Sequence, residues 1–271
     1  MKKYKFHINN NWSRQKVRRA IPLFASFFLA QFPLPAGSFS DKKAIPSFSS
    51  SPETLKFINF ELDMLKIYED AGLAEAGLSL EVFNKAMVGY LNLTHEGALA
   101  DKKILTIADF DVPSTQKRLW VLDLENNKLV YQSLVAHGKN SGWKEAGKFS
   151  NTIQSEMSSL GFYVTQGTYQ GKHGLSLKLE GMDKNFNDNA SKRCVVVHGA
   201  EYVSENFVKE NGFLGRSQGC PALPMDMHEK IIDTIQEKTV LYLHASDAGY
   251  YSEHLDTKVA METYYNNAWH I

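Results

Sequence analysis

Six short segments rich in branched and aromatic apolar residues, separated by polar loops, constrain the fold of this chain most. Their lengths and spacing are typical of strands, and ENNK (125–128) between the first two predicts a hairpin. The six predicted strands span 118–124, 129–136, 161–166, 175–181, 194–199 and 239–245. One helix is expected among them, at 225–238, with an apolar face of Met227, Ile231, Ile232 and Ile235. This order predicts a mainly β, sandwich-like domain at 101–246 with helical additions.

Two further helices are predicted in residues 53–100, ahead of the strands. Ser51 and Pro52 fit the N-cap and first turn of one helix. The second helix is expected to begin at Ser79. The residues at helical spacing, which predict the packing faces, are Leu55, Ile58, Leu62 and Leu65 in the first helix and Val82, Phe83, Ala86, Met87 and Tyr90 in the second. We expect this helical pair to pack on the β domain.

The N-terminal residues 1–36 have the layout of a secretory signal peptide. Residues 1–20 contain seven basic and no acidic side chains, an apolar run follows at 20–32, and small residues surround Ala36. The run is shorter than the roughly 20 residues that span a bilayer. Export to the periplasm or cell envelope is therefore expected, with no stable membrane insertion after cleavage, although retention as an uncleaved anchor is the alternative. Residues 37–52 predict a linker, and the aromatic tail 247–271 has no assignable role.

The net charge and the spacing of the histidines argue against a nucleic-acid-binding site and against a metal site. Thirty basic and thirty acidic residues cancel, so nothing favours binding to nucleic acid. The histidines outside the VVVHG segment occur singly, without metal-ligand spacing, so no metal site is expected.

The chain has only two cysteines, Cys194 and Cys220, and we predict that both are free thiols. Cys194 begins the predicted strand that ends near His198, and four residues of strand separate the two by about 13 Å. If His198 adjoins Cys220, Cys194 lies beyond the roughly 7 Å Cα separation that a disulfide allows. Cys194 is accordingly expected to be a buried strand residue.

Two segments contain the histidine and the cysteine that thiol chemistry requires. VVVHG places His198 beside Gly199 at the end of a strand, and GRSQGC places Cys220 after a glycine-containing turn. An imidazole can accept the thiol proton, and amides of the turn, at Gly219 and Cys220, can donate to a developing oxyanion. Each residue also has an ordinary structural interpretation. Cysteine is often buried, and Ser217 is a common turn former.

The stretch HGAEYVSENFVKENGFLGRSQGCPAL (198–223) resembles the active-site signature of the L,D-transpeptidase superfamily, and most closely the murein L,D-transpeptidase catalytic domain family. The framework around it is similar as well, in ILTIADFDVPSTQKRLWVLDLENNKLVYQSLVAHGKNSG, FSNTIQSEMSSLGFYV and TYQGKHGLSLKLEGMDKNFNDNASKR. The resemblance covers roughly residues 57–245 and implies an L,D-transpeptidase-type β-sandwich catalytic domain with an N-terminal helical pair and one helix after the cysteine.

The resemblance also implies roles for individual residues. Cys220 would be the nucleophile and His198 the base, with Ser217 and Gly219 shaping the site around them. Substrate contacts are expected at Arg216, Gly199, Tyr163, His173 and Tyr202. The wider family often has a histidine where this chain has Gln218, and an Arg/Asn pair after the cysteine where this chain has Pro221, Ala222 and Leu223. His198 must then be the only base within the motif, and Arg216 is the expected substitute for the missing arginine.

The function implied is that of an exported cysteine acyltransferase acting on peptidoglycan stem peptides, with release of D-alanine and formation of a 3-3 cross-link. The resembled reaction needs neither a metal nor an organic cofactor, because the sulfur itself carries the acyl group. Water as acceptor would make the same site an L,D-carboxypeptidase or cross-link hydrolase, and a D-amino acid would make it an exchange enzyme. A catalytically silent peptidoglycan-binding module is an alternative of another class. A papain-like peptidase is a weaker one, because that family places its cysteine before its histidine. The acceptor and the oligomeric state cannot be deduced from the sequence.

Overall fold

The computed structural model describes residues 51–267, which begin with two helices, α1 (Pro52–Asp70) and α2 (Leu80–His95). The strands are β1 (Ile104–Asp109), β2 (Leu119–Asp123), β3 (Lys128–Ser133), β4 (Gly161–Gly171), β5 (Gly174–Gly181), β6 (Val196–Gly199), β7 (Ala222–Leu223) and β8 (Val240–His244). The remaining helices are α3 (Glu205–Asn211), α4 (His228–Ile235), the 3-10 helix η1 (Glu253–Leu255) and α5 (Thr257–Asn266).

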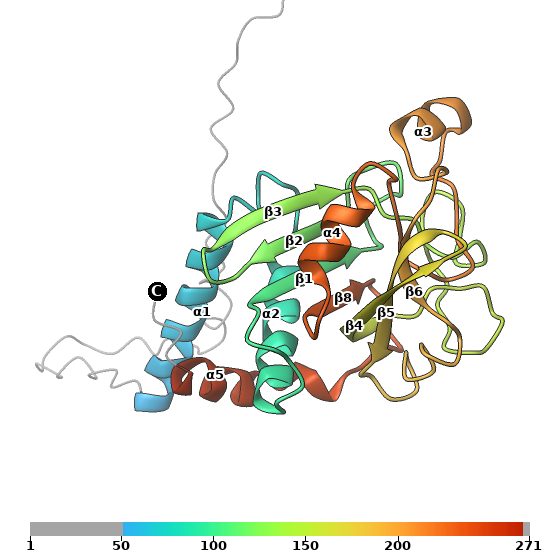
Figure 1. The fold of residues 1–271 in the computed structure, drawn as a ribbon. Coiled ribbons are helices and arrows are strands. Elements are labelled where there is room, and N and C mark those ends of the chain that lie inside the picture. Colours follow the sequence, from blue (N-terminus) through green and yellow to red (C-terminus); the bar gives the residue numbers. More distant parts are fainter. Residues whose placement is uncertain (1–50, 268–271) are drawn as a thin grey trace, which may run out of the picture. The chain divides into compact units, whose positions relative to one another are not determined.

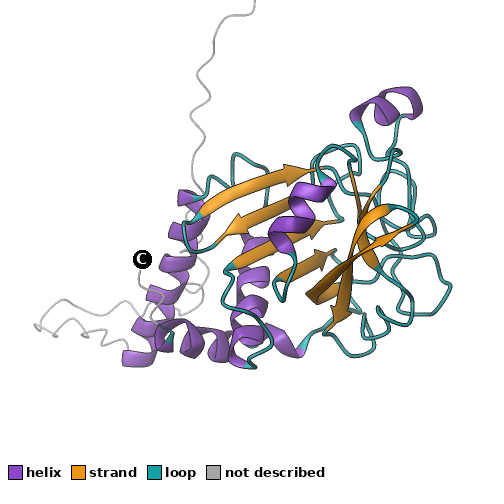
Figure 2. Cartoon of the chain, viewed as in Figure 1, coloured by secondary structure: helices purple, strands orange, loops and turns teal. Residues whose placement is uncertain are grey.

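The eight strands form one sheet in the order β3-β2-β1-β8-β4-β5-β6-β7 (Figure 1). The β1–β8 and β6–β7 pairs are parallel, and the other neighbours are antiparallel. The sheet is nearly closed and sandwich-like, so the expected mainly β fold is confirmed. Helices α1, α2 and α5 lie on one side of the view, whereas long loops gather on the opposite side, around β4, β5 and β6 (Figure 2).

The sheet separates two hydrophobic cores because alternate residues of a strand point to opposite faces. In β8, Val240 and Tyr242 pack with α1, α2 and α5, whereas Leu241 and Leu243 pack with α4. Figure 1 shows α2 behind the sheet and α4 in front of it. The central strands β1 and β8 are covered on both faces, which explains why every one of their residues is buried and most are apolar.

The N-terminal helix begins as expected but buries a different face. Ser51 is its N-cap, with its side chain accepting a hydrogen bond from the Thr54 amide, and Pro52 is in the first turn. The buried side chains, also at helical spacing, are Phe60, Met64, Ile67 and Tyr68. Of the residues expected to pack, Leu55, Ile58 and Leu62 are 50%, 45% and 56% exposed. That prediction was wrong: α1 carries two apolar stripes, and only contact with α2 and α5 determines which is buried.

Two helices were not expected from the sequence. Helix α3 has recognisable caps, Ser204 and the left-handed Gly212, but it buries no residue. Helix α5 begins at the Asp256 N-cap and packs against α2. The expected helix after Cys220 is shorter than predicted, because Met227 and His228 first form a turn on Pro224 and the backbone at Glu237 and Lys238 has positive φ.

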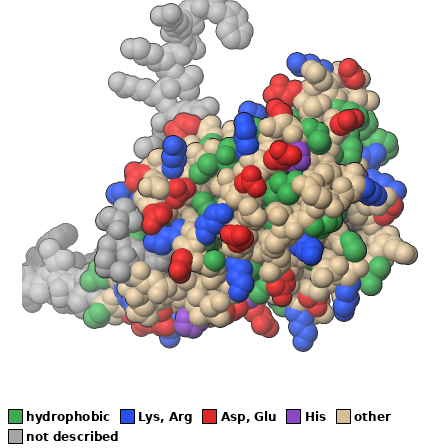
Figure 3. Space-filling view, in the orientation of Figure 1, with side chains coloured by type: hydrophobic (Ala, Val, Ile, Leu, Met, Phe, Trp, Pro, Cys, Tyr) green, Lys and Arg blue, Asp and Glu red, His purple; other side chains and the backbone are tan. Residues whose placement is uncertain are grey.

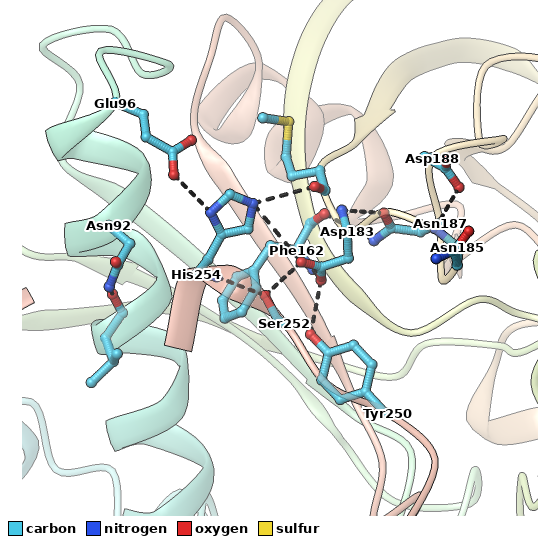
Figure 4. Close-up of polar contacts among 12 residues, drawn as sticks. Asn92, Glu96, Phe162, Asp183, Asn185, Asn187, Asp188, Tyr250, Ser252 and His254 are labelled. Carbon is cyan, nitrogen blue, oxygen red and sulfur yellow. Dashed lines mark hydrogen bonds and ion pairs between the residues drawn. The ribbon is translucent and has the colours of Figure 1, made fainter. Parts of the chain in front are cut away.

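The C-terminal segment is bound to the domain by buried polar contacts, drawn in Figure 4. The Asp183 carboxylate is buried and accepts hydrogen bonds from the Phe162 amide, the Tyr250 hydroxyl and the Ser252 hydroxyl. His254 contacts the Glu96 carboxylate through Nδ1 at 3.0 Å and the Met182 carbonyl through Nε2 at 3.2 Å. The part of the tail that the structure describes therefore completes the domain instead of extending from it.

The predicted boundary between the linker and the helical segment lies at the start of α1. The predicted signal peptide, and the predicted linker up to residue 50, lie outside the described residues. The last two linker residues are the cap and first residue of α1, and the described residues, 51–267, belong to one compact unit. Between residues 51 and 267, no helix has both the length and the apolar composition required to cross a bilayer.

Candidate active site

The pairing of β6 with β7 brings the two motifs of the sequence together. His198 is in register with Ala222, so Cys220 lies two residues ahead of the position that pairs with the histidine. Both side chains line one cavity of about 960 Å³. The other walls include residues 153–156, the end of the β4–β5 hairpin, and the loops before β6 and β7. The sequence expectation that the thiol and the imidazole share one site is therefore consistent with this arrangement.

The His198 ring is fixed by its neighbours in a defined tautomer. Its Nδ1 lies 2.9 Å from the Gly199 carbonyl oxygen, which can only accept, so Nδ1 carries the proton and Nε2 has the free lone pair. The His173 ring stacks on it with centroids 4.5 Å apart. Burial, together with the charges of His173, His228 and Lys172, lowers the pKa of His198. The ring is consequently neutral at pH 7 and able to accept a proton.

Ser217 shapes the turn that carries the thiol. Its amide donates to the His137 carbonyl, its hydroxyl donates to the Cys220 carbonyl at 2.6 Å, and its Oγ accepts from the Gly219 amide at 3.0 Å. The Gly219 amide is thus used within the turn and is not available to an oxyanion. Among described residues, no acceptor is bonded to the Cys220 amide, which remains the candidate donor from this turn.

Gly219 is required for steric reasons that the sequence did not reveal. Its φ is +118°, and a Cβ placed there would lie 2.7 Å from the Met157 carbonyl oxygen and 3.2 Å from Nη2 of Arg193. The missing side chain therefore makes room for another loop of the protein.

The Cys220 thiol is directed at the backbone before β6. Its sulfur lies 3.7 Å from the Cys194 carbonyl oxygen, and no hydrogen bond joins it to the His198 ring among the described residues. Burial raises the pKa of Cys220, while the Val196 amide and the Arg193 guanidinium oppose that effect. The thiol is therefore protonated at pH 7 and needs a base for activation.

Both cysteines are free, as predicted, but the reasoning about Cys194 was wrong. Cys194 is exposed, has φ +54°, and lies in a turn in which the amides of Cys194 and Val195 donate to Ser191 and Ala190. Because β6 begins only at Val196, Cys194 is not a buried strand residue. The turn brings its carbonyl to the Cys220 sulfur, so the separation deduced from an extended strand does not apply.

The expected substrate-contacting residues fall into two groups. Arg216, His173 and Tyr202 line the cavity. The Arg216 guanidinium lies 3.7 Å from the centre of the Trp143 ring and donates to the Lys139 and Gly142 carbonyls. Burial, together with the nearby Cys220, raises the pKa of Tyr202 to about 12, so its hydroxyl remains a neutral donor.

Two expected contacts do not reach the cavity. Tyr163 is fully buried in the core beside α4, with its hydroxyl bonded to Ser159, and it is not among the residues that line the cavity. Gly199 is buried too, and a Cβ on it would lie 2.6 Å from the His228 ring. The structural role of Gly199 is to hold His198 through its carbonyl and to admit His228.

Arg193 is a cavity residue that the sequence analysis missed. Its guanidinium donates to Ser159 Oγ at 2.9 Å, to Ser155 Oγ at 3.2 Å and to the Met157 carbonyl. The only sequence signal was a basic pair, Lys192 and Arg193, directly before the strand that carries His198.

Elsewhere, Asp109, Asp111 and His244 place potential metal-ligand atoms within 4.8 Å of one another. None of the three lines the cavity, and the Asp111 carboxylate already accepts the amide and hydroxyl of Ser246. Burial, chiefly, raises the pKa of Asp109 to about 6. The hydrogen bonds between Asp111 and Ser246 show that this cluster joins the segment after β1 to the segment after β8.

Comparisons with known proteins give one family. The family described as L,D-transpeptidase catalytic domain matches residues 74–244. No match is found among curated proteins. One similar solved structure is an L,D-transpeptidase from Mycobacterium smegmatis, with 15% identity and a TM-score of 0.33, covering 53% of this chain and 59% of that one. Another is the helical cell shape determining protein Pgp2 (K307A mutant) from Campylobacter jejuni, with 15% identity and a TM-score of 0.35, covering 69% and 64%. The chain thus spans less than two thirds of each of these proteins.

Proposed function

Because this chain belongs to the L,D-transpeptidase catalytic domain family, we propose that it is an exported cysteine acyltransferase that acts on peptidoglycan stem peptides. The observation that carries the proposal is the shared cavity of Cys220 and His198, whose Nε2 lone pair is left free by the Nδ1 bond to Gly199. A neutral thiol and a neutral imidazole in one cavity are the starting state for general-base activation of a nucleophile.

In the first half-reaction the Cys220 proton passes to Nε2 of His198, and the sulfur attacks the carbonyl carbon of the third residue of a tetrapeptide stem. This step requires the thiol to leave the Cys194 carbonyl and turn toward the ring. The oxyanion that forms is stabilised by the Cys220 amide. When the intermediate collapses, the bond to the terminal D-alanine breaks, and its nitrogen takes the proton back from His198.

In the second half-reaction an amine of another stem peptide attacks the thioester. The amine loses a proton to His198, the carbon–sulfur bond breaks, and the protonated thiol is restored with a 3-3 cross-link as product. No metal or organic cofactor enters either step, because the sulfur itself carries the acyl group.

Incubation of residues 37–271 with tetrapeptide muropeptides, followed by mass spectrometry, tests the proposal. Release of D-alanine with dimer formation is expected, whereas tripeptide monomer alone would identify the carboxypeptidase reaction. Intact substrate, together with no covalent adduct from a carbapenem, would instead favour a silent binding module. Export is tested separately, by locating the full-length protein in fractionated cells and sequencing its mature N-terminus.

A further inference from the structure

The guanidinium of Arg193 is held rigidly at the cavity wall. Three bonds, to Ser155, Met157 and Ser159, use both of its terminal nitrogens. It also lies close to the turn that carries the nucleophile, since a Cβ on Gly219 would be 3.2 Å from Nη2. A side chain with this many anchors has lost its rotamer freedom before substrate arrives, so it can bind an anion at little further entropic cost.

No carboxylate neutralises Arg193. Its three hydrogen-bond acceptors are hydroxyl and carbonyl oxygens, and no acidic side chain of residues 51–267 forms an ion pair with it. Burial lowers the pKa of Arg193, which means that its charge is partly removed from water. A half-buried guanidinium without a counter-charge is unfavourable unless something else, such as a ligand, supplies an anion.

The surrounding cavity has the same charge imbalance. Its lining includes Lys172, Lys192, Arg193 and Arg216. The only acidic residue that lines it in the described part of the chain is Glu156, which is paired with Lys139 at 2.7 Å. The excess is local, because the chain as a whole has no net charge, and basic and acidic side chains are interspersed on the face shown in Figure 3. A positive cavity in a balanced protein favours an anionic ligand.

We propose that Arg193 is a specificity-determining residue that binds a carboxylate of the substrate beside the carbonyl attacked by Cys220. This inference rests on the proposed function and deepens it. The enzyme then takes acyl donors with a free carboxylate next to the scissile bond and discriminates against their amides. The alternative role for Arg193 is purely structural: its hydrogen bonds would only hold the turn before β6 against residues 155–159, which we call the staple role.

A pair of alkylating reagents separates these roles without any peptidoglycan substrate. Iodoacetate and iodoacetamide react with the same thiol, but only iodoacetate carries a carboxylate. Peptide mass mapping measures the alkylation rate of Cys220 with each reagent. The ratio of the iodoacetate rate to the iodoacetamide rate is expected to be higher for Cys220 than for the cysteine of a free peptide. Arg193→Gln should lower the iodoacetate-to-iodoacetamide ratio by roughly tenfold, and Arg193→Lys by less. Lys184→Gln removes an exposed charge outside the cavity and should leave the ratio unchanged.

A staple role predicts a different result, in which Arg193→Gln changes both rates by the same factor. That outcome, with circular dichroism showing a folded variant, would overturn the proposal. The proposal would also be overturned if Arg216→Gln removed the preference for iodoacetate while Arg193→Gln retained it. Should Arg193→Gln not fold, the wild-type protein still decides: D-alanine, but not D-alaninamide, should protect Cys220 from iodoacetate, and equal protection by both contradicts the proposal.

The same variants are then assayed on tetrapeptides with a free C-terminal carboxylate, a C-terminal amide or an amidated D-glutamate. Arg193→Gln should lower kcat/KM for the acid substrate by roughly 10- to 100-fold and leave one of the amides nearly unaffected, which identifies the carboxylate that is bound. If the alkylation ratios behave as expected but no peptide is turned over, the proposed function fails while carboxylate binding stands. If peptides are turned over and no variant changes their discrimination, only the role of Arg193 fails.

Discussion

The sulfur of Cys220 lies 3.7 Å from the carbonyl oxygen of Cys194, a residue 26 positions earlier in the chain. The contact comes from the backbone of Cys194, whereas its own thiol is exposed. The resting nucleophile is therefore held by a main-chain acceptor next to β6 and not by the imidazole that we propose activates it.

Substitution of Cys220 and substitution of Cys194 should accordingly have unequal effects on acylation. Cys220→Ala is expected to abolish both carbapenem adduct and turnover, because it removes the proposed nucleophile. Cys194→Ser keeps the backbone carbonyl and should retain most of the wild-type acylation rate, measured by intact-protein mass spectrometry. A Cys194→Ser variant that is folded but cannot be acylated would contradict the assignment of the nucleophile.

The pH dependence of alkylation should report a buried thiol. Burial raises the pKa of Cys220, so its thiolate fraction at pH 7 is smaller than that of a free cysteine, and the reaction with iodoacetamide should still be accelerating above pH 9. Stopped-time mass spectrometry at pH 6 to 10 measures the profile. A rate that levels off below pH 7 would indicate a thiolate–imidazolium pair in the resting enzyme.

Loss of the imidazole should slow acylation without unfolding the domain. His198→Ala removes the proposed base, and the acylation rate constant should fall by roughly 10²- to 10⁴-fold. Because burial lowers the pKa of His198, the wild-type rate should remain near its maximum down to pH values below 6.5 and then decrease as the ring is protonated. His95→Ala, in the last turn of α2, is the matched control and should change neither quantity.

Glycine at position 219 should be needed for both stability and catalysis. Gly219→Ala places a Cβ 2.7 Å from the Met157 carbonyl at φ +118°, and the strain should reduce the free energy of unfolding by roughly 1–3 kcal/mol. The displaced turn should also lower the acylation rate. Gly147→Ala has no atom within 4 Å of its new Cβ and should be close to neutral in the same denaturant titration. Equal stability of the two variants would disprove the close approach of the loops.

The C-terminal segment should depend on one buried carboxylate. Asp183→Ala leaves the Phe162 amide and the Tyr250 and Ser252 hydroxyls without their acceptor, and should cost roughly 2–4 kcal/mol of unfolding free energy. Hydrogen exchange should increase most in residues 247–267. Asp226→Ala, at an exposed position, is the control, and unchanged exchange in the tail would show that Asp183 does not hold it.

Local sequence patterns predicted most of the elements and the two chemical motifs. The six expected strands are present, Ser51 and Ser79 are the caps of α1 and α2, and Ile231, Ile232 and Ile235 are the buried face of α4. These features depend on residues within a few positions of one another, where side-chain periodicity and capping are encoded directly.

Contacts between distant residues decided what the sequence could not. The buried stripe of α1, the burial of Tyr163 and the entry of Arg193 into the cavity all follow from how segments pack, not from their own composition. Cys194 illustrates the physical reason. Its neighbours suggested a strand, but a turn stabilised by main-chain hydrogen bonds, together with the pairing of β6 and β7, brings its carbonyl to Cys220. The sequence alone therefore predicted a site built on the thiol and the imidazole, and the tertiary structure determined which groups surround them.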